Sequence, residues 1–221
     1  MRAIILAAGR GTRMGSLTDA VPKPLLKVGD KYLIEYSIYA LKKIGIEDII
    51  INVSYLKDDI KTALGNGSAY GVRFHYSEEE EALETGGGIV KALPMLGKSP
   101  FIALSSDVIC DYPLSKLPRR LKGLAHLVLV NNPSFHPKGD FNLNKNLLQN
   151  ADQNDFTYAN IGVYDPNLFT EQKITKFKLG TVLKTAVAES KITGEVYQGS
   201  WFNIGTPEDL AGLSTENLNF L

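Results

Sequence analysis

Residues 6–26 read LAAGRGTRMGSLTDAVPKPLL and directly follow a short apolar run. The stretch holds three basic side chains, Arg10, Arg13 and Lys23, against one acid, Asp19. Its three glycines allow the backbone to turn sharply and to expose N–H groups, which can form an anion-binding nest. Basic side chains beside such a nest can add charge-assisted hydrogen bonds to phosphate oxygens. The stretch therefore predicts a phosphate site after the first strand, although a glycine-rich surface turn fits the loop alone equally well.

Two common phosphate-binding loops do not fit this stretch. No G-x-x-x-x-G-K-[ST] string occurs in the chain, which excludes a P-loop. A dinucleotide-binding loop has G-x-G-x-x-G leading directly into a helix, followed by an acid near the end of the second strand. Here the glycines are spaced G-x-G-x-x-x-G, and the second apolar run ends in Asn52-Val53-Ser54. What remains is a long loop wrapped around phosphates at the end of the first strand of an open α/β sheet.

Length and composition predict a single soluble domain with a substantial core. The chain has 221 residues, of which 44% are hydrophobic and 22% are charged. Lys plus Arg and Asp plus Glu balance at 24 each, so no bulk field attracts nucleic acid or a membrane. A single cysteine, Cys110, excludes an internal disulfide framework, and no apolar run approaches the ~20 residues that span a bilayer. We therefore expect a cytoplasmic protein without nucleic-acid or membrane partners; its oligomeric state is not determined by the sequence.

Strand-like and helical patterns alternate along the chain, which predicts an α/β fold with a three-layer, open, mostly parallel sheet. The segment 131–155 is polar and rich in Asn, and indicates an inserted lobe or hairpin. The expected strands cover 2–8, 48–53, 72–76, 101–105, 125–130 and 156–164, with strand-like character over 195–204. The expected helices cover 31–44, 57–64, a segment ending near Pro94, 177–190, and a last one from Pro207 with Thr206 as N-cap.

The motif LAAGRGTRM, followed by PKPLL, resembles the N-terminal fingerprint of the sugar-phosphate nucleotidyltransferases. These enzymes join a nucleoside triphosphate to a sugar 1-phosphate and release pyrophosphate. Further matches are LIEY at 33–36, ETGGGI at 84–89, the aspartate after the fourth strand, GLAHLVLV at 123–130, GDF at 139–141 and W-x-x-x-GT at 201–206. With the short length, they are similar to the bacterial uridylyltransferases that act on N-acetylmuramate 1-phosphate in cell-wall recycling.

The resemblance implies a Rossmann-like nucleotidyltransferase domain over 1–221 with a small sugar-binding lobe. Its nucleotide-binding part spans about 1–110 and its sugar-phosphate part about 111–221. The expected catalytic residues are Arg13 and Lys23, which hold the triphosphate, and Asp107; Lys23 also steadies charge that develops on the α-phosphate. The residues expected to bind UTP are Leu6, Ala7, Ala8, Gly9, Gly11, Thr12, Arg13, Lys23, Gly86, Gly87 and Gly88. The glycine triplet among them corresponds to a turn that faces the nucleobase, and its alternative is a plain helix start.

The resemblance also places a metal and a sugar. Asp107 corresponds to the principal Mg²⁺ ligand, and a hard carboxylate oxygen suits an ion that also binds phosphates. Asn203 stands where the family has a second carboxylate, so we expect a weaker second ligand there. Glu84, Asp140 and Asn160 are expected to contact the sugar, although an aspartate in a turn such as Asp140 is equally explained by local bonding.

Several features have no expected function, or depart from the family pattern. The Glu78–Glu81 run is expected to be a solvent-exposed face, and the three histidines have no metal-binding spacing. Ser105 and Ser106 precede Asp107 where the family usually has a glycine. Because the attacking phosphate is already an anion, no protein nucleophile is needed, and Cys110 has no required role. Two alternatives stay open: the same chemistry on another pair, such as GTP and mannose 1-phosphate, or a non-catalytic nucleotide-sugar binder.

Overall fold

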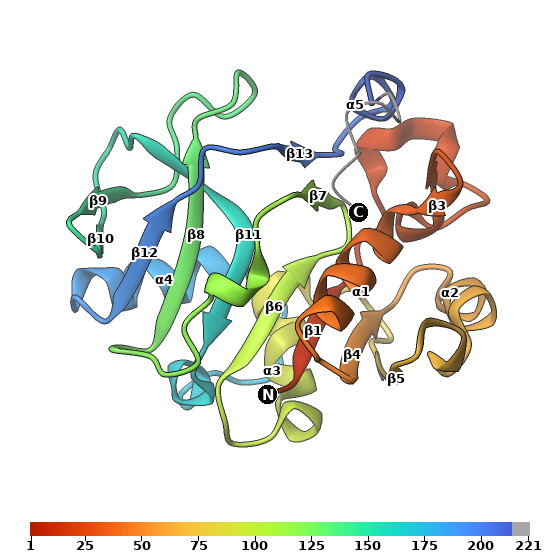
Figure 1. Cartoon of the computed structure of the whole chain (residues 1–221), viewed down its shortest axis with the longest axis horizontal. Coiled ribbons are helices and arrows are strands. Elements are labelled where there is room, and N and C mark those ends of the chain that lie inside the picture. Colours follow the sequence, from red (N-terminus) through yellow and green to blue (C-terminus); the bar gives the residue numbers. More distant parts are fainter. Residues whose placement is uncertain (214–221) are drawn as a thin grey trace.

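A computed structural model describes residues 1–213 of the chain, and it is built around one mixed sheet (Figure 1). Residues 214–221 of the expected domain lie outside the described residues. The strands of the sheet are β1 (Ala3–Leu6), β4 (Asp48–Val53), β5 (Arg73–Glu78), β6 (Phe101–Ser105), β8 (Ala125–Asn131), β9 (Asn142–Asn144), β10 (Leu147–Gln149), β11 (Phe156–Tyr164) and β12 (Ile192–Val196). Their order is β5-β4-β1-β6-β11-β8-β12-β10-β9.

Most strands of this sheet point the same way. The pairs β1–β4, β1–β6, β4–β5 and β8–β12 are parallel, whereas the pairs made by β10 and β11 are antiparallel. Within the described part of the chain, β10 and β11 are therefore the two strands of this sheet that oppose the others. The expected mostly parallel α/β sheet is confirmed.

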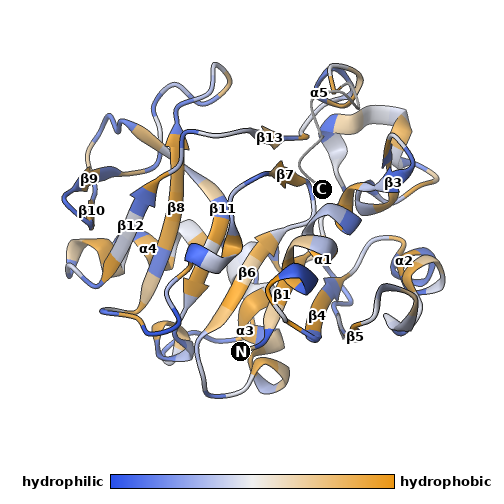
Figure 2. Ribbon diagram, in the orientation of Figure 1, coloured by the Kyte–Doolittle hydropathy of each residue, from blue (hydrophilic) through white to orange (hydrophobic). Residues whose placement is uncertain are grey.

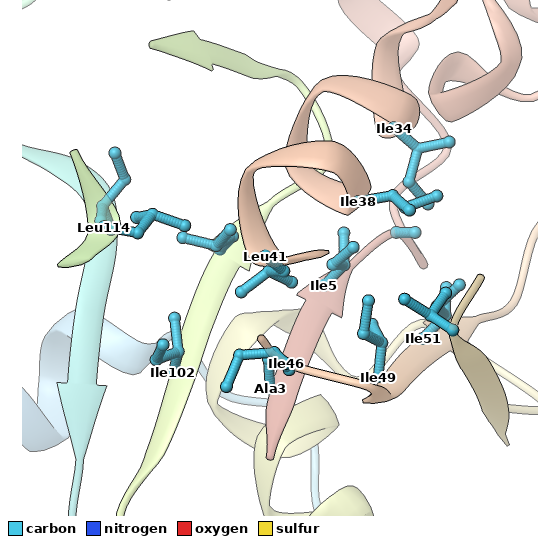
Figure 3. Close-up of a cluster of buried hydrophobic side chains, with 14 of the residues drawn as sticks. Ala3, Ile5, Ile34, Ile38, Leu41, Ile46, Ile49, Ile51, Ile102 and Leu114 are labelled. Carbon is cyan, nitrogen blue, oxygen red and sulfur yellow. The ribbon is translucent and has the colours of Figure 1, made fainter. Parts of the chain in front are cut away.

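Helices cover both faces of the sheet, as the three-layer prediction requires. They are α1 (Leu33–Lys43), α2 (Lys57–Leu64), α3 (Glu84–Leu96), α4 (Leu179–Ala188) and α5 (Pro207–Ala211). Because successive side chains of a strand point to opposite faces, Ile5 packs in the cluster that contains α1, while Ile4 packs in the cluster that contains α3 and α4. Figure 3 shows Ile34, Ile38 and Leu41 of α1 against the apolar side chains of the strands. Figure 2 shows much of β1, β6 and β8 in orange, the hydrophobic end of the scale.

The first loop is ordered by packing, which excludes a plain surface turn. It forms two 3₁₀ segments, Thr12–Thr18 and Lys23–Leu25, with Gly11 and Gly15 at positive φ. Met14, in the first of them, is 1% exposed and belongs to a small apolar cluster with Leu26, Leu33 and Ile204, among others. The loop is thereby held at the carboxyl end of β1, where an open α/β sheet binds ligands.

Several local bounds differ from those expected, and two of the differences have a clear local cause. The strand expected over 2–8 ends at Leu6, because the N–H of Ala7 leaves the strand pairing and donates to the side chain of Asn52 instead (2.8 Å). The helix expected over 31–44 starts at Leu33, because Lys31–Tyr32 form a short strand, β3, that pairs with β2 (Lys27–Val28).

The polar segment 131–155 contains the expected hairpin. It forms β9 and β10, which extend the main sheet through the pairing of β10 with β12. A second small sheet, made of β7 (Val108–Cys110) and β13 (Trp201–Asn203), adjoins the carboxyl end of β6. Thr206 caps α5, as expected, by accepting from the N–H of Asp209. Within residues 1–213, none of the helices combines the length and the apolar character that a membrane crossing requires.

Candidate active site

A pocket of about 440 Å³ lies at the carboxyl ends of β1 and β6, beside the first loop. Of the loop residues expected to bind the nucleotide, all but Ala7 line this pocket. The lining residues are Leu6, Ala8, Gly9, Arg10, Gly11, Thr12, Arg13, Lys23, Pro24, Asn52, Ala82, Glu84, Thr85, Ser105, Ser106, Asp107, Lys176 and Gly205. Although Asp107 follows Lys23 by 84 positions along the chain, the predicted catalytic residues thus share one cavity. We call it the phosphate pocket.

Lys23 and Asp107 form an ion pair on the wall of this pocket. Lys23 is 8% exposed, and it is the one buried lysine or arginine among residues 1–213. The Ser105 hydroxyl donates to the other oxygen of the Asp107 carboxylate (2.6 Å). Ser105, one of the two serines that precede Asp107, therefore has a role in orienting this carboxylate. A charged amine and a carboxylate, held side by side, can meet a phosphate and its metal counter-ion respectively.

Glycines allow the two predicted phosphate-binding cations to lie close to backbone. A side chain at Gly11, which has φ of 69°, would come within 3.0 Å of the methylenes of Lys23. A side chain at Gly205 would come within 3.0 Å of the Arg13 guanidinium. The GT of the motif at residues 201–206 is thus in contact with the first loop, which explains why these distant motifs belong together.

A buried polar network beneath the pocket was missed from the sequence. Asn52 Nδ2 donates to Glu79 Oε1 (2.8 Å), and the N–H of Leu83 donates to Glu79 Oε2 (2.8 Å). Glu79 is 1% exposed, so the expectation that Glu78–Glu81 is wholly a solvent-exposed face is wrong at this position. Since Asn52 also accepts from Ala7, the network ties the first loop to the start of α3. The one sequence feature that could have indicated this network is Asn52, a polar residue near the end of the apolar run 48–53.

The glycine triplet lies in the first turns of α3 and packs against protein, which fits the alternative of a helix start. A side chain at Gly86 would lie 2.3 Å from the Phe177 ring, and one at Gly88 would lie 2.6 Å from Asn52 Nδ2. The N–H groups of Gly86 and Gly87 both donate to the Phe177 carbonyl. These donors are therefore not free for a nucleobase, and the three glycines do not line the phosphate pocket. Their nucleotide-binding role stays a prediction, whereas Thr85 and Glu84 just before them do line the pocket.

Replacing Gly87 with alanine is expected to lower the free energy of unfolding by about 1–3 kcal/mol, because the added carbon would lie 2.1 Å from the Thr175 carbonyl oxygen. The matched control is Gly180→Ala in α4, where a side chain meets no atom within 4 Å. Urea denaturation of both variants provides the measurement. Equal stabilities for the two variants would contradict the packing role of Gly87.

A second pocket, of about 270 Å³, adjoins the first, and we call it the sugar pocket. Leu6 and Thr85 line both pockets, so the two cavities meet there. The other lining residues are Ala103, Phe135, His136, Asp140, Phe141, Thr157, Tyr158, Asn160, Leu179, Gly180, Leu183, Lys184, Trp201 and Asn203. The polar segment before β11 contributes several of them, as expected of a sugar-binding lobe.

The three residues expected to bind the sugar are divided between the pockets. Asp140 and Asn160 line the sugar pocket, whereas Glu84 lines the phosphate pocket. The Asp140 carboxylate accepts from the N–H of Tyr158 (2.9 Å) and lies 3.1 Å from His136 Nε2, so local bonds occupy it. Asn160 has φ of 58° at a register shift in β11, a conformation that is strained for a residue with a side chain. Glu84, at φ 60°, is strained in the same way.

The two expected metal ligands lie close along the small sheet: Asp107 in the turn before β7, and Asn203 at the end of β13. Val108, next to Asp107, is paired with Asn203 across β7 and β13, and the N–H of Ile204 donates to the Asp107 carbonyl (2.9 Å). Asp107 lines the phosphate pocket and Asn203 the sugar pocket, on either side of this ladder. No group of three or more His, Cys, Asp or Glu side chains within residues 1–213 could hold a metal by itself. The donor set fits Mg²⁺, which takes one or two protein oxygens and completes its shell with water and substrate phosphates.

The surroundings of the Cys110 thiol disfavour its use as a nucleophile. Burial raises the pKa of the Cys110 thiol to about 12, so the sulfur stays protonated near neutral pH. It lines neither the phosphate pocket nor the sugar pocket. Two further cations that the sequence did not single out as ligands, Arg10 and Lys176, do line the phosphate pocket. Arg10 belongs to the LAAGRGTRM motif, whereas no motif marks Lys176, which the fold alone brings to the pocket.

Comparison with known proteins agrees with this geometry. The family model described as "Nucleotidyl transferase" matches residues 2–140. An N-acetylmuramate alpha-1-phosphate uridylyltransferase from Neisseria meningitidis serogroup B is 41% identical over 218 residues, which cover 93% of this chain and 94% of that protein. A mannose-1-phosphate guanyltransferase from Candida glabrata is 33% identical over 96% of this chain and 63% of its own length.

Solved structures share the fold at lower sequence identity. The inositol-1-phosphate CTP transferase from T. maritima superposes with a TM-score of 0.81 at 21% identity, covering 99% of this chain and 94% of that one. A protein described as a glucose-1-phosphate thymidylyltransferase from Bacillus anthracis gives a TM-score of 0.85, also at 21% identity, covering 99% of this chain and 96% of its own.

The chain belongs to the nucleotidyl transferase family. Within it, the protein is a sugar-1-phosphate nucleotidyltransferase, an enzyme whose substrates are a nucleoside triphosphate and a sugar 1-phosphate. The resemblance noted in the sequence, and the fold expected from it, are thereby confirmed. The family typically uses a divalent metal.

Proposed function

We propose that the enzyme transfers the uridylyl group of UTP to N-acetylmuramate 1-phosphate, giving the UDP-sugar and pyrophosphate in cell-wall recycling. The observation that carries the proposal is the 41% identity to the Neisseria uridylyltransferase, which extends over both pockets. The geometry supports it, because a pocket lined by Arg13, Lys23 and Lys176 adjoins an aromatic-lined pocket of suitable size for a sugar. In this proposal, residues of about 1–110 serve mainly the nucleotide, and residues of about 111–221 the sugar phosphate.

The proposed reaction is an in-line displacement at the α-phosphorus. An oxygen of the sugar 1-phosphate forms a bond to the α-phosphorus while the bond to the bridging β-phosphate oxygen breaks, and pyrophosphate leaves. Lys23 and Arg13 bind the triphosphate, and Lys23 offsets the negative charge that develops on the α-phosphate. The junction of the pockets at Leu6 and Thr85 is where the two phosphates would meet. Catalysis is then mainly positioning and electrostatic stabilisation.

We propose Mg²⁺ as the metal, with Asp107 as its main protein ligand and Asn203 as a weaker second one. When bound, the ion neutralises and orients the phosphates. The amide oxygen of Asn203 is neutral, so it stabilises the ion less than a carboxylate does. Asp107 and Lys23 are paired with each other. In this proposal, Asp107 turns to the metal and Lys23 to the phosphates when the substrates bind.

Replacing Asn203 with aspartate is expected to lower the Mg²⁺ concentration needed for half-maximal activity, by roughly tenfold if one more charged ligand contributes about 1.4 kcal/mol. The measurement is the rate of pyrophosphate release over a Mg²⁺ titration. The control is Asn131→Asp, which adds the same charge at an exposed position at the end of β8. An unchanged Mg²⁺ requirement in Asn203→Asp would remove Asn203 from the metal site.

The substrate assignment is tested by turnover over a matrix of nucleotides and sugars. UTP and GTP are each combined with N-acetylmuramate 1-phosphate and mannose 1-phosphate, and pyrophosphate release is measured. The proposal expects the highest kcat/KM for UTP with N-acetylmuramate 1-phosphate. If kcat/KM is highest for GTP with mannose 1-phosphate, the alternative pair is favoured. The similarity to a mannose-1-phosphate guanyltransferase is the reason for including this pair. Binding of UTP without turnover of any pair would indicate a non-catalytic binder. The cytoplasmic location expected from the sequence stays part of the proposal.

A further inference from the structure

The sugar pocket contains a positive charge that the protein does not neutralise. Its ionisable residues include His136, Asp140 and Lys184. The Asp140 carboxylate lies 3.1 Å from His136, so any charge on that imidazole is met within the protein. The ammonium of Lys184 makes no ion pair with any residue in the described range 1–213. Lys184 is an exposed residue of α4, so it lies at the solvent-facing edge of the pocket, where an anionic group of the sugar can reach it.

The position of Lys184 along α4 separates it from the reacting phosphates. At the start of the helix, the N–H of Leu179 donates to the Thr85 hydroxyl (3.0 Å), and Thr85 lines both pockets. Lys184 follows Leu179 by five residues, which places it about 7.5 Å further along the helix axis, at 1.5 Å per residue. The phosphate pocket has its own cations, Arg13, Lys23 and Lys176. Lys184 is therefore placed to bind an anionic group on the sugar at a distance from its 1-phosphate.

The proposed substrate carries such a group. N-acetylmuramate differs from N-acetylglucosamine by a lactyl ether on C3, which adds one carboxylate away from the anomeric phosphate. The rest of the pocket wall is largely apolar and aromatic, with Phe135 stacked on Trp201 at 6.5 Å and the Trp201 indole held by a bond to the Ala159 carbonyl. Lys184 itself is exposed, so its pair with this carboxylate is partly screened by water, and a modest preference is expected.

We propose that Lys184 binds the lactyl carboxylate and makes the enzyme select N-acetylmuramate 1-phosphate over N-acetylglucosamine 1-phosphate. This inference rests on the proposed function, because it concerns the same sugar pocket. Lys184 is a specificity-determining residue in this account and takes no part in the chemistry at phosphorus.

The test is kcat/KM for the two sugar phosphates, at fixed UTP and Mg²⁺, in the unaltered enzyme and in Lys184→Met, Lys184→Arg and Lys191→Met. Lys184→Met is expected to lower kcat/KM for N-acetylmuramate 1-phosphate by roughly 2- to 5-fold, as for loss of an exposed ion pair. Its kcat/KM for N-acetylglucosamine 1-phosphate should be unchanged. Lys184→Arg, which keeps the charge, should retain most of the preference. Lys191, an exposed lysine beyond the same helix that lines neither pocket, is the control, and its replacement should change neither value.

The outcomes separate this inference from the proposed function. Equal losses for the two sugars in Lys184→Met would overturn the inference, because they would indicate contact with the shared 1-phosphate or a general structural effect. No loss for either sugar would overturn it as well. If the unaltered enzyme itself fails to prefer N-acetylmuramate 1-phosphate, the proposed function fails first and the inference with it.

Discussion

Lys23→Met is expected to lower kcat by about 10²–10³-fold, the loss typical of removing one preorganised group that stabilises transition-state charge. Lys23 is the one buried cation within residues 1–213, and its ammonium lies beside Asp107 on the wall of the phosphate pocket. A buried cation is less screened than one in water, so its contribution to charge at the α-phosphate is large. Methionine keeps much of the length and apolar contact of the side chain against Gly11 while removing the charge. The measurement is steady-state pyrophosphate release at saturating substrates.

The control for this variant is Lys27→Met, since Lys27 is exposed and lines neither pocket. Its kcat should stay close to that of the unaltered enzyme. Circular dichroism and thermal unfolding should show that Lys23→Met remains folded. A folded Lys23→Met with undiminished kcat would show that the ion pair with Asp107 is structural, and it would exclude the proposed electrostatic role of Lys23.

Asp107→Asn is expected to lower kcat/KM by on the order of 10³-fold at moderate Mg²⁺, because the substitution removes the negative charge of the proposed metal ligand. The substitution preserves the size of the side chain and an oxygen that can accept from Ser105. It also leaves the buried Lys23 ammonium without its partner, which adds a cost in stability. Part of the lost activity should return when Mg²⁺ is raised, since the amide oxygen remains a weak ligand. The measurement is the initial rate as a function of Mg²⁺ concentration.

Asp152→Asn provides the matched control, because Asp152 is exposed in the turn before β11 and lines neither pocket. Its Mg²⁺ dependence should match that of the unaltered enzyme. A proportional loss of rate at every Mg²⁺ concentration, with the same half-saturating value, would assign Asp107 to substrate positioning through Lys23 and exclude it as a metal ligand.

The sequence predicts the fold and the phosphate pocket well, because each depends on local patterns. The apolar runs at 48–53 and 101–105 form strands with the expected bounds, since strands buried on both faces read as continuous apolar segments. The first loop is identifiable because its glycines and cations lie within one short stretch. Asp107 is identifiable because it lies two residues past a buried strand, where the family resemblance places a metal ligand.

Contacts between distant segments account for what the sequence does not predict. Glu79 lies in a run of four acids, and nothing in that run distinguishes it; it is buried because Asn52 and the N–H of Leu83 converge on it. The glycine triplet is ambiguous for another reason. Close approach of a nucleobase and close approach of Phe177 both require that a side chain be absent, so composition alone cannot separate the two roles. Lys176 and Lys184 belong to no motif, and they reach the pockets through the placement of α4 and the loop before it.

The most direct test of the central claim follows the phosphates of UTP during the reaction with N-acetylmuramate 1-phosphate and Mg²⁺. Separate reactions contain UTP labelled at the α- or at the γ-phosphate, and the products are separated and counted. Nucleotidyl transfer places the α-label in the UDP-sugar and the γ-label in pyrophosphate, and this is the result we expect. Transfer of the γ-label to the sugar, or binding of both substrates without any movement of label, would contradict the account.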